Sequence, residues 1–191
     1  NDTNVQISEE TRQRVLSAVA QLGYRPNVIA RSLRTQRSQM IALMIADISN
    51  GFYQSMTRAV QDVARQYDYE VMVANSDHVY KYEKHFCDVV SRRSIDGVIM
   101  VPFRLTEEDI NRFYHEVNAP ITILGSHIKH PNIDVVYLND TRAVEETIHW
   151  MIHERGYTRI GYVGVTDDFP PGPRRFDGFM RAMNQAGLAI D

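Results

Sequence analysis

The chain has 191 residues, of which 43% are hydrophobic and 24% charged, and its formal net charge at pH 7 is −3. Its longest apolar run, residues 40–46, is far shorter than the roughly 20 residues of a membrane-spanning helix, so we expect no membrane partner. A single cysteine, Cys87, excludes an internal disulfide, and residues 1–4 have no feature of a secretion signal. We therefore expect a globular protein located in the cytoplasm.

The first predicted element is a helix that begins after Ser8 and continues to Leu22. Ser8 can cap the helix, and Glu9 and Glu10 follow it in the first turn, where carboxylates interact favourably with the helix dipole. Gly23 suits the position where such a helix ends.

A short basic segment, residues 23–35, comes next and has the character of a hinge. Arg25 precedes Pro26 and is therefore kept out of helical geometry, whereas Asn27 can cap a helix of about two turns. A helix this short is marginally stable in water because nucleation is costly. We expect it to form only on a partner surface.

The charge of this region indicates which surface. No acidic residue lies between Glu10 and Asp47, but six arginines do: Arg12, Arg14, Arg25, Arg31, Arg34 and Arg37. Without these six, the chain has 15 basic against 24 acidic residues, a net charge of −9. This asymmetry indicates a polyanionic partner, although a solvated basic linker also explains the charges. Leu33 favours DNA, because an apolar side chain among arginines can enter between base steps.

From residue 40 onward, predicted strands alternate with predicted helices. Apolar runs predict strands at 40–46, 69–74, 97–101, 120–124, 134–138 and 159–163. Apolar residues at helical spacing predict helices between 56 and 67 and at 80–93, 106–117, 139–156 and 174–186. In the helix at 80–93, the inward face is expected to carry Tyr82, Phe86, Val89 and Val90, and residues 170–173 are expected to form a loop.

This alternation predicts an α/β fold built of parallel sheets with helices on both faces. Ligands of such folds bind beyond the carboxyl ends of the strands. The candidate loops are therefore residues 47–53, 75–78, 102–104, 125–130 and 166–175.

Several short motifs follow one another along the chain. They are Ser8-x-x-Thr11-Arg12-x-Arg14-Val15, Leu22-Gly23-Tyr24-x-Pro26-Asn27, Ala30-Arg31-Ser32-Leu33-Arg34, Asp47-Ile48-Ser49-Asn50, Asp96-Gly97-Val98-Ile99, Arg159-Ile160-Gly161-Tyr162-Val163-Gly164 and Arg175-Phe176-x-Gly178-Phe179. In content and order they resemble the motifs of the lactose/galactose-repressor (LacI/GalR) family of bacterial transcription factors. The resemblance covers the chain from about Ser8 to its end.

The resemblance implies a regulator made of four parts. Residues 1–26 would be the remnant of a helix-turn-helix headpiece whose recognition helix precedes the sequence, and residues 27–37 the hinge helix and linker. Residues 38–139 would form the N-terminal subdomain of a ligand-binding core and residues 140–191 the start of its C-terminal subdomain. The core would resemble periplasmic sugar-binding proteins, with two doubly wound parallel-sheet subdomains, the second incomplete.

The resemblance also implies the binding residues and partners. In a homodimer, the hinge would contact operator DNA through Arg25, Asn27, Ala30, Arg31, Leu33 and Arg34, with Leu33 inserted in the minor groove. A small-molecule effector, a sugar or related metabolite, would lie between the subdomains, lined by Phe52 and Tyr53 and bound at its polar groups by Arg175. Without the resemblance, the two aromatic residues are explained by packing at a helix start and Arg175 by solvation. The sequence departs from the family pattern at Gly51, residues 125–127 and residues 139–140, and the departure at 125–127 leaves the ligand class open.

Other functions are less well supported by the residues. A solute receptor with the same core fold is the alternative, but a secretion signal would be expected where the arginine-rich hinge lies. An enzyme would need a nucleophile or acid–base pair, and Asp47 and Asp77 have no such partners in the crevice loops, so we predict no catalytic residue and no cofactor. His149 and His153 lie four apart but lack the glutamate of a zinc-protease motif, so we predict no metal site.

Overall fold

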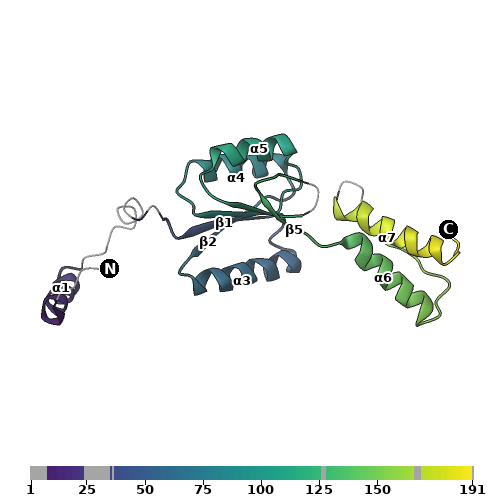
Figure 1. Cartoon of the computed structure of the whole chain (residues 1–191), viewed down its shortest axis with the longest axis horizontal. Helices are drawn as coiled ribbons and strands as arrows, with labels where there is room; N and C mark the ends of the chain where they lie inside the picture. Colours follow the sequence, from purple (N-terminus) through teal and green to yellow (C-terminus); the bar gives the residue numbers. More distant parts are fainter. Residues whose placement is uncertain (1–7, 24–34, 36, 126–127, 166–168, 191) are drawn as a thin grey trace. The chain divides into compact units, whose positions relative to one another are not determined.

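The computed structural model describes residues 8–23, 35, 37–125, 128–165 and 169–190. The chain divides into two compact units, Asn1–Ser38 and Gln39–Asp191. Helix α1 (Glu9–Leu22) belongs to the first unit, and all other described helices and strands belong to the second (Figure 1).

Helix α1 is capped at both ends as its sequence predicts. The Ser8 hydroxyl accepts a hydrogen bond from the Thr11 N–H, and Gly23 ends the helix with a left-handed φ of 58°. None of its residues is buried, and the apolar side chains of Val15 and Leu22 are 55% and 81% exposed. The apolar stripe of α1 is therefore uncovered in this structure.

The second unit contains one parallel sheet of five strands. The strands are β1 (Met40–Ile45), β2 (Glu70–Asn75), β3 (Gly97–Met100), β4 (Ile121–Leu124) and β5 (Asp134–Val136), in the order β2-β1-β3-β4-β5. In β1, Ile41 lies opposite Val71 on one side and Gly97 on the other. The last four residues of β1 are fully buried, which explains its continuous apolar run, because a central parallel strand is covered on both faces.

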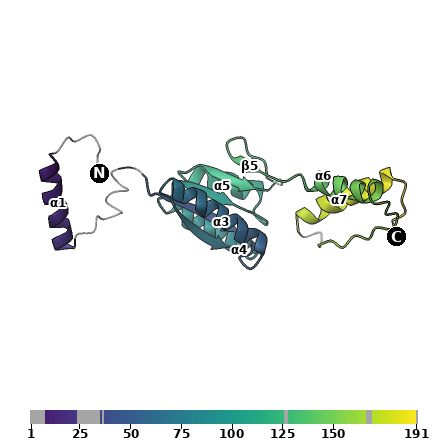
Figure 2. The same ribbon diagram turned by 90° about the horizontal axis from the view of Figure 1, so that it is seen from below.

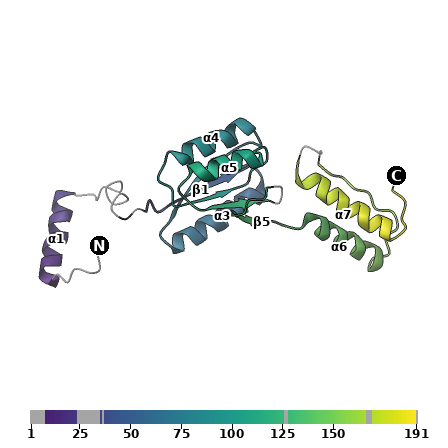
Figure 3. The same cartoon turned by 45° about the horizontal axis from the view of Figure 1, so that its top comes forward.

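Three helices cover the two faces of this sheet. They are α3 (Gly51–Gln66), α4 (Tyr80–Ser91) and α5 (Glu107–Glu116). Helices α4 and α5 lie together on one face and α3 lies on the other (Figures 1 and 3), and Figure 2 gives the view from the α3 side. Alternate side chains of β1 point to opposite faces of the sheet. Met44 packs in the cluster under α4 and α5, whereas Leu43 packs in the cluster that includes Tyr53 of α3.

The inward face of α4 differs from the predicted one. The buried residues are Glu83, Phe86, Cys87 and Val90, whereas Tyr82 is 49% exposed. The stripe is rotated because Glu83, which a hydrophobic pattern assigns to the outside, finds buried hydrogen-bond donors in the loop after β3.

Helices α6 (Asp140–His153) and α7 (Pro171–Gln185) pack against each other around Ile148, Phe179 and Met183. The close approach depends on Gly178, because a Cβ atom there would collide with the carbonyl oxygen of Thr141.

Two predictions in this part of the chain were wrong. Helix α7 begins at Pro171 and not near residue 174, since proline is tolerated in a first helical turn, where the backbone N–H groups have no partner within the helix. Residues 159–163 do not form a strand, because no neighbouring strand in the described part of the chain can accept their hydrogen bonds. The sheet of the second subdomain remains a prediction.

Among the described residues, no helix has both the length and the apolar character that crossing a bilayer requires.

Candidate functional site

The loops at the carboxyl end of the sheet are held by side-chain hydrogen bonds. The side-chain Oδ1 of Asn75, at the end of β2, accepts the Ile48 N–H at 2.9 Å, which ties the loop after β1 to the neighbouring strand. Within that loop, Asp47 accepts hydrogen bonds from the hydroxyl and the N–H of Ser49, and these two bonds, the hydroxyl's first, lower the pKa of Asp47. The loop therefore has a defined shape at the place where α3 starts.

Phe52 and Tyr53 lie together in the first turn of α3. Asn50 caps this helix by accepting the Phe52 N–H at 3.0 Å, and the two aromatic rings meet edge to face with centroids 5.2 Å apart. Phe52 is 57% exposed, whereas Tyr53 is 5% exposed and belongs to the core. Burial and the negative charge of Asp47 raise the pKa of Tyr53 to about 12, against the opposing charge of Arg175, so its hydroxyl stays protonated. Of the two predicted ring contacts, Phe52 is the accessible one.

A second aromatic cluster, formed by His78, Phe103 and Phe169, was not predicted by residue. Each member lies in a loop that the sequence marked as a candidate, but the individual side chains gave no signal. The Phe103 ring stacks on Phe169 with centroids 5.2 Å apart and meets the His78 ring at 4.5 Å. These rings thus join the loops after β2 and β3 to the segment that precedes α7.

The loop that carries His78 combines backbone strain with unpaired polar atoms. Asp77 and His78 both have left-handed φ values, 50° and 58°, which cost energy for residues other than glycine. In the described part of the chain, no hydrogen-bond partner is found for the buried Ser76 hydroxyl or for His78 Nδ1. Strain and unpaired buried polar atoms are both common at binding sites.

Arg175, the predicted polar contact of the ligand, lies in α7 and is anchored by Asp140. Its Nε donates to Asp140 Oδ1 at 3.2 Å, while Arg174 Nη2 donates to Oδ2 of the same carboxylate at 2.8 Å. Within the described ranges, no hydrogen bond occupies the two terminal nitrogens of Arg175. Those nitrogens are the ones that could bind hydroxyls or a carboxylate of a ligand.

The six predicted DNA contacts lie outside the described residues. They are Arg25, Asn27, Ala30, Arg31, Leu33 and Arg34. Their roles remain predictions.

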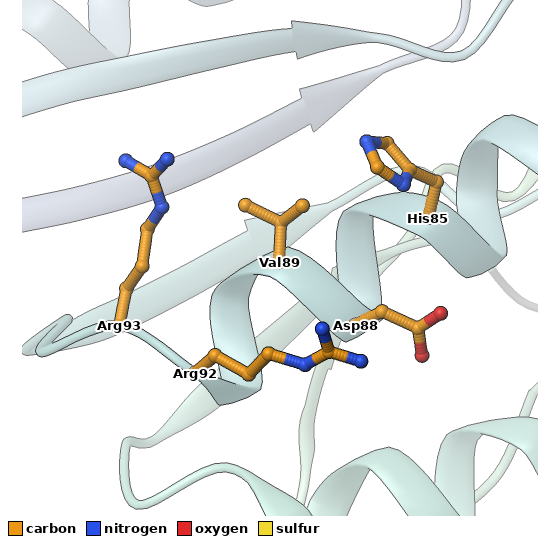
Figure 4. Close-up of a pocket in the computed structure, with 5 residues that line it drawn as sticks. All are labelled: His85, Asp88, Val89, Arg92 and Arg93. Atoms are coloured by element: carbon orange, nitrogen blue, oxygen red, sulfur yellow. The ribbon is translucent and has the colours of Figure 1, made fainter.

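A hollow of about 340 Å³ lies beside α4, away from the crevice loops. It is lined by His85, Asp88 and Val89 of α4 and by Arg92 and Arg93, whose side chains are drawn in Figure 4. Arg92 and Arg93 directly follow the last residue of α4, where cations stabilise the free carbonyl groups of a helix. Helix capping therefore explains these arginines without a ligand.

Other reactive side chains have structural explanations. The rings of His149 and His153 stack at 5.6 Å, and His149 Nε2 lies 2.8 Å from Gln185 Oε1. No group of three metal ligands occurs among the residues with described positions. Burial raises the pKa of the Cys87 thiol to about 12, which makes it a poor nucleophile.

Comparison with known proteins gives consistent matches. The family model described as "Periplasmic binding proteins and sugar binding domain of LacI family" matches residues 38–191. The HTH-type transcriptional regulator RegA of Clostridium saccharobutylicum is 33% identical over 192 residues, which cover 100% of this chain and 57% of that protein. The ribose operon repressor of Halalkalibacterium halodurans is 31% identical over 183 residues, 96% of this chain and 54% of the repressor.

The solved structures include a putative ribose operon repressor from Burkholderia thailandensis. It is 28% identical, has a TM-score of 0.69, and the match covers 81% of this chain and 59% of that one. The chain thus spans a little over half the length of these relatives. The curated relatives are named as transcriptional regulators and not as enzymes.

Proposed function

This chain belongs to the family of periplasmic binding proteins and LacI sugar-binding domains, and from that premise we propose that it is part of a ligand-responsive, DNA-binding repressor. Its effector would be a sugar or a related small metabolite. The protein would act in the cytoplasm as a homodimer.

One observation carries this proposal. The sugar-binding family model begins at residue 38, directly after the acid-free segment with its six arginines. The match to the HTH-type regulator extends across that segment as well, because it covers the whole chain. A sugar-binding core preceded by a basic arm is the arrangement expected of a repressor and not of a solute receptor.

The proposed roles follow from the chemistry of the residues. The arginines would neutralise phosphates, and Leu33 would enter the minor groove of a bent operator. At the carboxyl end of the sheet, the exposed ring of Phe52 would pack on the effector. The terminal nitrogens of Arg175 would bind the hydroxyls of the effector. Because α7 carries Arg175, effector binding would change how the second part of the core sits, and the hinge would respond.

The experiment that tests the function uses the full-length protein. Operator fragments are selected from genomic DNA, and D-ribose, the sugar named by two relatives' operons, is tested first among a panel of monosaccharides and disaccharides. We expect selection of specific duplexes and a change in their affinity when one sugar is added. A protein that binds a sugar but no duplex would be a solute receptor, which would contradict the proposal.

A further inference from the structure

Glu83 is a completely buried carboxylate in the first turns of α4. Its oxygens accept hydrogen bonds from the backbone N–H groups of Phe103 at 2.8 Å, Arg104 at 2.9 Å and Leu105 at 2.9 Å. Among the described residues, no cationic side chain forms an ion pair with it. Because a buried charge is costly unless it is hydrogen-bonded, these three N–H groups are what keep the carboxylate inside.

The same turns of α4 also hold the start of α5. The Tyr80 hydroxyl and Lys84 Nζ both donate to Asp109 Oδ1 at 3.2 Å. Asp109 Oδ2 in turn accepts the N–H and the hydroxyl of Thr106 at 3.0 and 2.9 Å, closing the capping box of α5. The loop between β3 and α5 is thus fixed at two places, in its middle by Glu83 and at the start of α5 by Asp109.

The side chain that this loop presents to the crevice is Phe103. Its ring stacks on Phe169 and meets His78, and it packs against the core cluster that contains Tyr53. Tyr53 is the neighbour of Phe52, the accessible ring of the expected effector site. Phe103 therefore lies at the same end of the sheet as that site.

We propose that Glu83 is a positioning residue of the effector site and that Phe103, the side chain that it places, contacts the ring of the bound sugar. This inference rests on the proposed function. Its physical basis is pre-organisation: a binding wall that is already fixed before the ligand arrives loses little conformational entropy on binding. The carboxylate acts at a distance from the ligand, through the three N–H groups that it holds.

A double-mutant cycle in the full-length protein, with D-ribose as the probe, tests the coupling. Glu83→Gln keeps one acceptor oxygen but places an NH2 donor against the loop N–H groups, so we expect D-ribose affinity to fall about tenfold. Phe103→Ala should lower it by at least as much. In the Phe103→Ala background, Glu83→Gln should cost less than about twofold, because coupled residues are not additive. The matched control is Glu107→Gln, an exposed glutamate at the start of α5, which should change nothing.

A second measurement needs no sugar. The Phe103 ring shifts the NMR resonances of the His78 ring that it touches, so Glu83→Gln should move these resonances toward their positions in Phe103→Ala while thermal unfolding stays cooperative. In the wild-type protein, the N–H groups of residues 103–105 should exchange slowly with solvent. This measurement still tests the role of Glu83 if the protein binds no sugar. The absence of sugar binding would count against the proposed function and against Phe103 as a sugar contact.

Three results would overturn the inference. Fully additive losses in the cycle would mean that Glu83 does not act through Phe103. Unchanged His78 resonances in Glu83→Gln would mean that the loop keeps its place without the carboxylate. Fast exchange of the wild-type N–H groups at 103–105 would mean that Glu83 does not hold these groups in place. This measurement requires no variant that might fail to fold.

Discussion

The two ion pairs of Asp140 determine which single substitutions the proposed effector site can tolerate without loss of stability. Its carboxylate is shared by Arg174 and Arg175, and the Arg174 contact is the shorter, 2.8 against 3.2 Å. Arg174 is also the less exposed of the two arginines. Removing Arg175 therefore leaves Asp140 paired with Arg174, so the structural role of Arg175 can be separated from its proposed role in ligand binding.

We predict that Arg175→Ala abolishes the response to the sugar, with affinity reduced about tenfold or more, because a donor fork is lost. The free energy of unfolding should change by less than about 1 kcal/mol, since the remaining pair is kept and exposed pairs contribute little. Calorimetric titration and urea unfolding measure the two effects. Arg181→Ala, which breaks an exposed pair with Asp177 in the same helix, is the control and should keep the affinity. Unchanged sugar affinity in Arg175→Ala would remove Arg175 from the site.

Asp109 gives the second prediction for a single side chain. Burial opposes its ionisation, but hydrogen bonds from Thr106, Lys84 and Tyr80 outweigh burial and lower its pKa to about 2 from 3.8. A lowered folded-state pKa contributes stability that is present above pH 3.8 and is lost as the pH falls toward 2. Asp109→Asn should therefore flatten the acid dependence of stability in that window and cost about 1–3 kcal/mol at pH 7. Acid titrations followed by circular dichroism test this, with the exposed Glu108→Gln as control; equal slopes for wild type and Asp109→Asn would contradict it.

At the scale of helices, the packing of α6 against α7 depends on the absence of a side chain at Gly178. Gly178 of α7 lies against the backbone of Thr141 in α6. In an unpacked helix, Gly→Ala stabilises by roughly 0.5–1 kcal/mol, but here the methyl group would force the helices apart. We predict that Gly178→Ala lowers the free energy of unfolding by about 1–3 kcal/mol. Urea unfolding checks the sign, and Gly161→Ala, where a Cβ meets nothing within 4 Å, is the control. A stabilised Gly178→Ala variant would show that the helices are not in close contact.

The elements that could be predicted are those whose signals are local. The buried run of β1 and the capping residue Ser8 lead directly to the observed strand and to the start of α1. Residues 159–163 have the composition of a strand, but a strand also needs a neighbour, and that information is not local. The inward position of Glu83 could not be predicted for the same reason, because its partners follow 20 to 22 residues later.

In the candidate site, too, local features could be predicted from the sequence and contacts between distant residues could not. The sequence marked the loops at the strand ends, and the aromatic cluster of His78, Phe103 and Phe169 lies in three of them. Which side chains meet there depends on how the loops are held, for example by Asn75 and Glu83, and no spacing in the sequence reports that.

For the whole molecule, we propose that an acidic, sugar-binding body controls the DNA affinity of a basic arm. We predict that Leu33→Ala in the full-length protein weakens operator binding about tenfold or more and leaves sugar affinity unchanged, because the proposed role of Leu33 is to contact DNA and not the sugar. Footprinting measures the first effect and calorimetry the second. Arg37→Ala, at the end of the arm, should instead weaken binding similarly for all duplexes and reduce its salt dependence. Equal operator binding by wild type and Leu33→Ala would contradict the proposed wedge.

The most direct test is the affinity of the full-length protein for duplex DNA, measured across salt concentrations with and without the sugar that it binds. We predict tight binding at low salt, a loss on the order of 10³ between 50 and 200 mM salt as phosphate contacts are screened, and a shift of the whole curve on adding the sugar. Absence of duplex binding at the lowest salt concentration, or a curve that does not respond to the sugar, would contradict the proposed function of a sugar-responsive repressor.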